Sequence, residues 1–208
     1  MNLPSGEFKF EFNCYAASES HKQMLKINRM PQLKSARFLA RILGVCLVVP
    51  GLSVTARAEV EIDAAAPDFR LQDQAGEWHT LEQYRGQWVA LYFYPKDDTP
   101  GCTKEACAFR DNIFAFDEIG ATIIGVSLDD TESHKDFAEK YSLPFTILSD
   151  ADGSTAQAYG VLKSMGTFRF AERQSFIVGP DGTVRKHYRK VNAEKHSEEV
   201  LADLKQMM

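Results

Sequence analysis

The pattern of apolar and polar positions predicts alternating strands and helices from residue 66 to the end of the chain. An unbroken apolar run, typical of a strand buried on both faces, occupies residues 88–94. Further strand patterns occupy residues 66–71, 121–127, 145–148, 174–178 and 183–188. Helical patterns occupy residues 102–118, 131–141, 154–159 and 194–206. This order predicts an α/β domain of three layers with a mixed central sheet.

The first 58 residues have a different pattern. Basic residues precede an apolar run at 42–54, and the small-residue site Ala56-Arg-Ala58 closes that run. A basic segment, about a dozen apolar residues and such a site are typical of a secretory signal peptide. We therefore divide the chain into a leader, residues 1–58, and a domain, residues 59–208, and expect export to a bacterial periplasm. Met30 opens a leader of ordinary length, so the translation of residues 1–29 is an open question.

A cleaved organelle presequence is the alternative for this leader. Three acidic residues, Glu7, Glu11 and Glu19, argue mildly against it, because transit peptides are poor in acidic residues.

Charge and cysteine content change once the leader is set aside. The leader holds 8 of the 24 basic and 3 of the 29 acidic residues, which leaves 16 and 26 and a net charge of −10 on the domain. A domain that acidic has no electrostatic basis for binding a phosphate backbone, so nucleic-acid partners are excluded. Removing the leader also removes Cys14 and Cys46, so thiol chemistry in the domain must use Cys102 and Cys107.

A structural disulfide and a metal site are two readings of this cysteine pair. On one helix, five residues separate the Cα atoms by about 8–9 Å, whereas a disulfide requires less than about 7 Å. Zinc would require further ligands at regular spacing, and we expect the scattered histidines to lie at the surface and hold no metal. These histidines are His79, His134, His187 and His196.

A reactive thiol is the third reading, and it fits the residues around Cys102. Thr99 is a good N-cap and Pro100 suits the first helical position, which puts Cys102 in the first turn. Unpaired backbone N–H groups and the helix dipole favour a thiolate there. Pro95 shields one side, and the Thr99 hydroxyl is expected to donate to the sulfur or to a substrate oxygen. Cys107 is then a resolving cysteine that attacks oxidised Cys102 once the helix opens, whereas Lys104 and Glu105 are expected to be solvated.

The segment from Pro95 to Cys102, Pro-Lys-Asp-Asp-Thr-Pro-Gly-Cys, matches the Pro-x-x-x-Thr-x-x-Cys motif of peroxiredoxins. With Cys107, the domain resembles their Q-type, or bacterioferritin comigratory protein, branch. The resemblance implies a thioredoxin-like fold, reduction of hydrogen peroxide and organic hydroperoxides, and no cofactor. It also implies a catalytic arginine at Arg173 and a disulfide that thioredoxin or a similar dithiol protein reduces. The segment at 161–172 is shorter than is usual in the branch, which leaves the preferred peroxide open.

Two classes of function remain at this point. The first is a monomeric peroxidase that acts through Cys102 and Cys107, with no membrane contact after processing. The second is a redox or copper-handling binding protein on the same fold, without peroxidase turnover. Peroxide-dependent oxidation of a dithiol reductant distinguishes the two.

Processing of the leader is directly testable. We expect cleavage between Ala58 and Glu59, because residues 56–58 form the small-x-small site that closes the apolar run. N-terminal sequencing of protein recovered from its final compartment measures the cleavage position. A mature chain that begins before residue 50, or that keeps the apolar run, would contradict export through this signal.

Overall fold

The computed structural model describes residues 60–208, so the proposed leader lies outside the described residues. The strands are β1 (Arg70–Asp73), β2 (Trp78–Thr80), β3 (Trp88–Phe93), β4 (Ala121–Ser127), β5 (Thr146–Ser149), β6 (Leu162–Met165), β7 (Phe168–Ala171), β8 (Gln174–Val178) and β9 (Val184–Tyr188). The helices are the 3-10 turn η2 (Leu81–Tyr84), α1 (Pro100–Asp111), α2 (Ile113–Glu118), α3 (Thr131–Tyr141), α4 (Ser154–Ala158) and α5 (His196–Met207).

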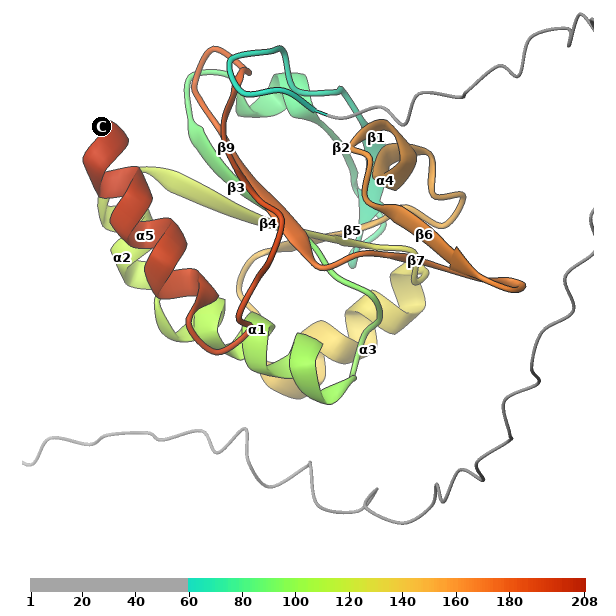
Figure 1. Ribbon diagram of the computed structural model, residues 1–208. Helices are drawn as coiled ribbons and strands as arrows, with labels where there is room; N and C mark the ends of the chain where they lie inside the picture. Colours follow the sequence, from blue (N-terminus) through green and yellow to red (C-terminus); the bar gives the residue numbers. More distant parts are fainter. Residues whose placement is uncertain (1–59) are drawn as a thin grey trace, which may run out of the picture.

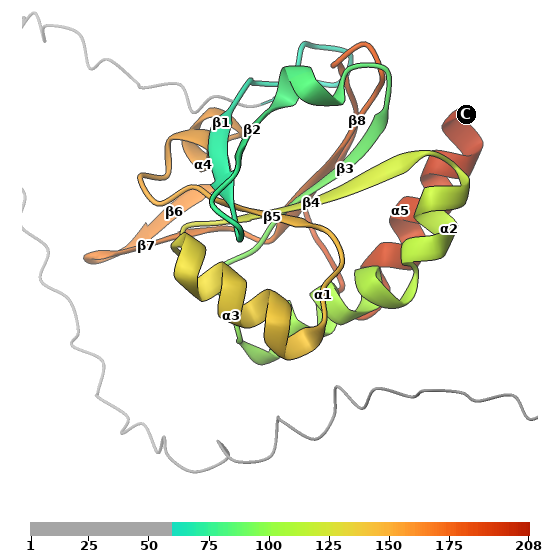
Figure 2. The same cartoon turned by 180° about the vertical axis from the view of Figure 1, so that it is seen from behind.

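Seven of these strands form one mixed sheet in the order β2-β1-β5-β4-β3-β8-β9. Strand β3 pairs parallel with β4 and antiparallel with β8, and β4 pairs parallel with β5. Figures 1 and 2 show α1, α2, α3 and α5 on one face of this sheet, with α4 and the β6–β7 hairpin toward the other. The three layers and the mixed sheet confirm the architecture expected from the sequence.

The central strand β3 is buried on both faces, which explains its unbroken apolar run. Ala90, Tyr92 and Tyr94 face a core formed with α1, α2, α3 and α5. Leu91 and Phe93 face a second core formed with β1, η2, α4 and β7. The period-2 alternation of a strand thus divides one apolar run between two cores. The first of these cores contains Cys102 and Cys107.

Tyr92 also fixes the residue beside it on β4. Gly125 is its register partner, and a Cβ at that position would lie 2.8 Å from the Tyr92 ring. Real Cβ atoms do not approach a ring so closely, so the buried tyrosine requires glycine there. The phenol ring in turn stacks on Phe109 of α1 at a centroid distance of 4.8 Å. Strand β3 therefore supports the helix that carries both cysteines.

Several elements differ from the sequence expectation. The helix expected over 102–118 is two helices, because the chain breaks at Asn112, whose side-chain amide donates to the Ala108 carbonyl. Helix α3 covers the expected residues and has Asp130 as its N-cap, whose side chain accepts from the Ser133 backbone N–H. The segment 161–172 contains the β6–β7 hairpin, which the pattern did not predict. Within residues 60–208, no helix has the length and apolar character needed to cross a bilayer.

Candidate active site

Cys102 lies where the central strand passes into α1. The chain leaves β3 at Phe93, runs through the loop 94–99 and enters the helix at Pro100, with Thr99 at the N-cap position. Cys102 is therefore in the first turn, as the sequence predicts, and its free thiol is 2% exposed. The first four backbone N–H groups of a helix lack intrahelical partners, so this position favours negative charge on sulfur.

Arg173 reaches the sulfur from the neighbouring strand. It directly precedes β8, and the pairing of Phe93 with Gln174 brings this end of β8 beside the loop that leads to Cys102. The Arg173 Nη2 atom donates to Cys102 Sγ at 3.0 Å. Gly101 makes room, since a Cβ there would lie 3.2 Å from Nη2. The structure thus brings together Cys102 and Arg173, which are 71 residues apart in the sequence.

Glu105 is the second partner of Arg173, and the sequence expectation for it was wrong. Its side chain is fully buried, and Oε2 accepts a hydrogen bond from Arg173 Nη1. Burial raises the pKa of the Glu105 carboxyl to about 7, against the opposing charge and hydrogen bond of Arg173. The spacing gave the missed signal, because Glu105 follows Cys102 by three residues and so shares its helix face. Lys104, by contrast, pairs with Glu194 in solvent, as expected.

The groups around Arg173 favour its positively charged form. Burial lowers the pKa of the guanidinium, but the negative charges of Glu105 and Cys102 and their hydrogen bonds outweigh burial, so the pKa is raised. A planar fork of donors suits this position, since one nitrogen can serve the sulfur and another the carboxylate.

Thr99 and Pro95 lie on the loop that leads from β3 to α1, and both are half-buried. The Thr99 hydroxyl donates to the Lys96 carbonyl oxygen at 3.0 Å and makes no capping bond to the helix. Its single proton is therefore directed away from the sulfur, which differs from the expected donation to Cys102. Rotation of this hydroxyl would release the proton for another acceptor.

Cys107 lies on the same helix and is 4% exposed. Because Cys102 is a free thiol, the two cysteines are not joined to each other here. Helical geometry keeps their Cα atoms about 8–9 Å apart, beyond the reach of a disulfide. Bond formation between them requires α1 to unwind.

The expectation of surface histidines was also wrong. His134 and His196 are fully buried, and His79 and His187 are half-buried and hydrogen-bonded. His196 shares a hydrogen bond of 2.7 Å with the Ser175 hydroxyl, and burial and the nearby Arg173 charge lower its pKa to about 4. Among residues 60–208, no group of three or more His, Cys, Asp or Glu side chains is arranged to hold a metal ion.

Comparison with known proteins gives this geometry a family. Residues 62–187 match the model of the AhpC/TSA family. The chain belongs to that family. It is 44% identical over 152 residues to peroxiredoxin Bcp of Bacillus subtilis. That alignment covers 71% of this chain and 97% of the Bacillus protein. It is 43% identical over 203 residues to chloroplastic peroxiredoxin Q of Populus jackii, covering 97% of this chain and 85% of that one.

Solved structures agree with the sequence relatives. A structure of the bacterioferritin comigratory protein of Xanthomonas campestris, described in terms of alkyl peroxide reduction, is 38% identical with a TM-score of 0.66. The match covers 72% of this chain and 98% of that one. The chain is therefore a peroxiredoxin of the Q type with a thioredoxin-like fold, and its activity is that of a thiol-dependent peroxidase.

The raised pKa of Glu105 predicts a pH-dependent stability. A carboxyl with a folded-state pKa of about 7 and an unfolded value near 4.5 stabilises the fold at low pH, and this stabilisation is lost as pH rises through about 7. Relative to Glu105→Gln, the wild-type side chain should lose about 2–3 kcal/mol of unfolding free energy between about pH 5 and pH 8. Denaturant unfolding across that range measures the difference.

The protein with Glu105 and the Glu105→Gln variant should both carry Cys102→Ser, so that no thiol at position 102 ionises or oxidises during the measurement. The lowered pKa of His196 gives a slope of opposite sign, but it is present in both proteins and cancels in the comparison. A difference that stays constant with pH would show that Glu105 is ionised throughout the range.

Proposed function

We propose that Cys102 is the peroxidatic cysteine of this peroxidase and that Arg173 stabilises its thiolate. The observation that supports this most directly is the 3.0 Å hydrogen bond from Arg173 Nη2 to Cys102 Sγ in the first turn of α1. A positive charge and a helix N-terminus act on one sulfur atom, and they offset the cost of burying its negative charge. Together they are what a thiolate nucleophile requires.

In the first step, the Cys102 thiolate attacks the outer oxygen of a hydroperoxide. The S–O bond forms as the O–O bond breaks, the sulfur becomes a sulfenic acid, and the alkoxide or hydroxide that leaves takes up a proton. Negative charge moves from sulfur to oxygen during this step. The guanidinium of Arg173 and the hydroxyl of Thr99, once rotated from Lys96, are positioned to stabilise that charge, while Pro95 limits access of water.

In the second step, Cys107 resolves the sulfenic acid. Its thiolate attacks the Cys102 sulfur, the S–O bond breaks, the hydroxide released becomes water, and an intramolecular disulfide forms. Because the intact helix holds the two residues too far apart, α1 must open between them. Thioredoxin or a similar dithiol protein then reduces the exposed disulfide by thiol exchange and returns the chain to its starting state.

The substrate class follows from the family, and we include organic hydroperoxides because the Xanthomonas campestris relative is described in terms of alkyl peroxide reduction. We propose that the protein works as a monomer without a cofactor. The relatives include both bacterial and chloroplastic proteins. We infer from the tripartite pattern that residues 1–58 are removed on export, with organelle import as the alternative.

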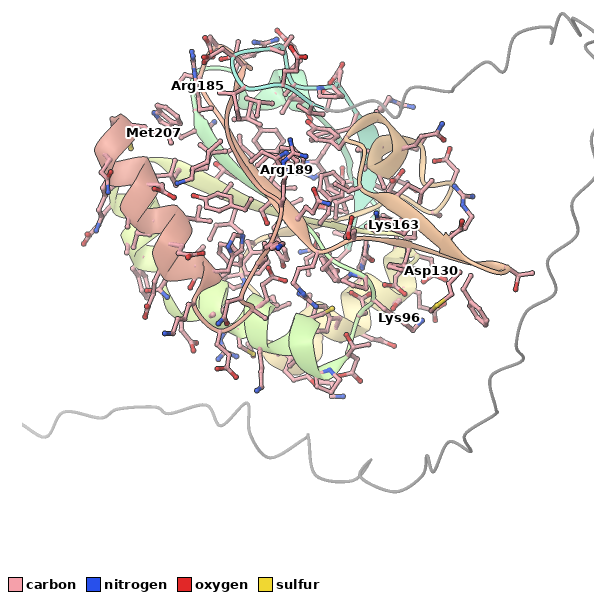
Figure 3. All side chains as sticks on the ribbon, viewed as in Figure 1. Lys96, Asp130, Lys163, Arg185, Arg189 and Met207 are labelled. Carbon is pink, nitrogen blue, oxygen red and sulfur yellow. The ribbon has the colours of Figure 1, made fainter. Side chains whose placement is uncertain are left out.

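Replacement of Arg173 tests the first step. Arg173→Met removes a charge-assisted hydrogen bond worth about 1.5–3 kcal/mol, so peroxide reduction should slow roughly ten- to hundredfold. Less of the thiol should be ionised at neutral pH, which the ultraviolet absorbance of the thiolate reports. Arg185→Met is a matched control, since Arg185 pairs with Asp63 and Asp181 at the opposite end of the domain from Lys96 (Figure 3). Equal rates in the two variants would contradict the assignment.

Single substitutions of the two cysteines distinguish their proposed roles. Cys102→Ser should abolish peroxide reduction, because no thiolate remains to attack. Cys107→Ser should keep the first oxidation but accumulate sulfenic acid, over-oxidise and lose turnover with a protein dithiol. Mass spectrometry after one equivalent of peroxide measures the products. In wild-type protein, an intermolecular bridge or a lasting sulfenic acid would refute the role given to Cys107.

A further inference from the structure

The loop that joins β3 to α1 contains a buried carboxylate. Asp97 is 6% exposed, and its two oxygens accept three side-chain hydrogen bonds. Tyr94 Oη donates to Oδ1 at 2.6 Å, while Ser133 Oγ and His134 Nδ1 lie 2.8 Å from Oδ2. Burial raises the pKa of Asp97, but these three partners outweigh burial and the pKa is lowered. Asp97 is therefore a carboxylate, and because it only accepts, the His134 proton is on Nδ1.

Further contacts hold the same loop to its surroundings. The backbone N–H of Asp97 donates to Asp129 Oδ2 at 2.9 Å, and the Ser127 hydroxyl donates to the same oxygen at 2.7 Å. The next residue, Asp98, accepts from Lys140 Nζ at 2.6 Å and from the hydroxyl of Tyr141. Figure 3 shows Lys96 and Asp130 at one end of the domain, where this loop meets the start of α3.

The side-chain partners of Asp97 and Asp98 are on α3, apart from Tyr94, which belongs to the loop itself, and the Asp97 backbone N–H donates to Asp129, which follows β4. Among the described residues, the side-chain hydrogen bonds of Asp97 include none to α1, the helix that must unwind during resolution. Pro95 lies two residues before Asp97, and Thr99 lies two residues after it. Asp97 and Asp98 are thus held independently of α1, although Thr99 at the end of the loop is the N-cap of that helix.

We propose that Asp97, held by Tyr94, Ser133 and His134, is a positioning residue for peroxide reduction. It fixes the loop that carries Pro95 and Thr99 against α3, so that these two groups keep their places beside Cys102. Burying a carboxylate costs desolvation free energy, and losing one of its partners costs several kcal/mol more. Apolar side chains of similar volume would stabilise the loop without either cost. The directional bonds of Asp97 instead define where the backbone lies. The proposal rests on the role given to Cys102 above.

The test uses the full-length protein and measures two rates after rapid mixing with hydrogen peroxide, by quenching with an alkylating agent and mass spectrometry. These are the rates of Cys102 oxidation and of subsequent disulfide formation. Tyr94→Phe and His134→Leu should each slow oxidation about tenfold, because small displacements of positioning groups have effects of this size. Disulfide formation should keep its rate. His134→Asn, which retains an N–H near the position of Nδ1, should recover most of the oxidation rate.

Tyr159→Phe is the matched control. Its hydroxyl donates to the Pro67 carbonyl at 2.8 Å in the second core, on the other face of the sheet, so it loses a comparable buried bond away from the loop. It should oxidise at the wild-type rate. Oxidation as slow in Tyr159→Phe as in Tyr94→Phe would overturn the proposal in favour of a general loss of stability.

If His134→Leu does not fold, Tyr94→Phe decides the matter, since it changes no packing volume and leaves Asp97 with two donors. Unchanged oxidation in Tyr94→Phe, with an active wild-type protein, would overturn the role of Asp97 alone. A wild-type protein whose Cys102 does not react with peroxide would overturn both the proposed function and this role.

Discussion

The site depends on the hydrogen bonds of the Arg173 guanidinium. This cation bridges two acidic groups that are both buried away from water, the Cys102 thiol and the Glu105 carboxyl. One nitrogen donates to the Cys102 sulfur and another to the Glu105 carboxylate. Burial of the sulfur and the carboxyl without a cation would cost several kcal/mol per charge. The fold supplies that cation from the end of β8, and the antiparallel pairing of β3 with β8 sets its position. The sheet register therefore sets where this cation lies relative to the Cys102 sulfur.

The same helix meets two opposite requirements. Folded, α1 presents its N-terminal N–H groups to Cys102 and packs Phe109 on Tyr92 of the central strand. Opened, it would allow Cys107 to reach Cys102, which the folded geometry prevents. If α1 opens as proposed, the break at Asn112 would limit the length of helix involved, because α2 begins anew at Ile113. The loop before α1, tied to α3 through Asp97 and Asp98, would then remain as a fixed upstream end.

Much of this could be predicted from the sequence. The strands β3 and β4, the Thr99-Pro100 helix start and the place of Cys102 in the first turn follow from local patterns, and the structure confirms those placements. Arg173 was expected only from the family resemblance, and the structure places it 3.0 Å from the Cys102 sulfur. What could not be predicted depends on tertiary contacts. Glu105, His134 and His196 resemble surface residues by composition, and only the packing of α1, α3 and α5 on one sheet face makes them buried. The β6–β7 hairpin was missed because its short strands pair only with each other and contain exposed Met165 and Phe168.

Asp97 and Glu105 show how environment assigns different states to two buried carboxyls eight residues apart. Three side-chain donors satisfy Asp97, so its pKa is lowered and it is a fixed negative charge at neutral pH. Glu105 has Arg173 on one oxygen and no hydrogen-bond partner on the other among the described residues, so burial raises its pKa to about 7. If both Glu105 oxygens had hydrogen-bond donors, the carboxyl would stay ionised and would neutralise most of the Arg173 charge. Because Glu105 has only one partnered oxygen and a pKa raised to about 7, it offsets the Arg173 charge incompletely, and the same guanidinium also donates to the Cys102 sulfur at 3.0 Å.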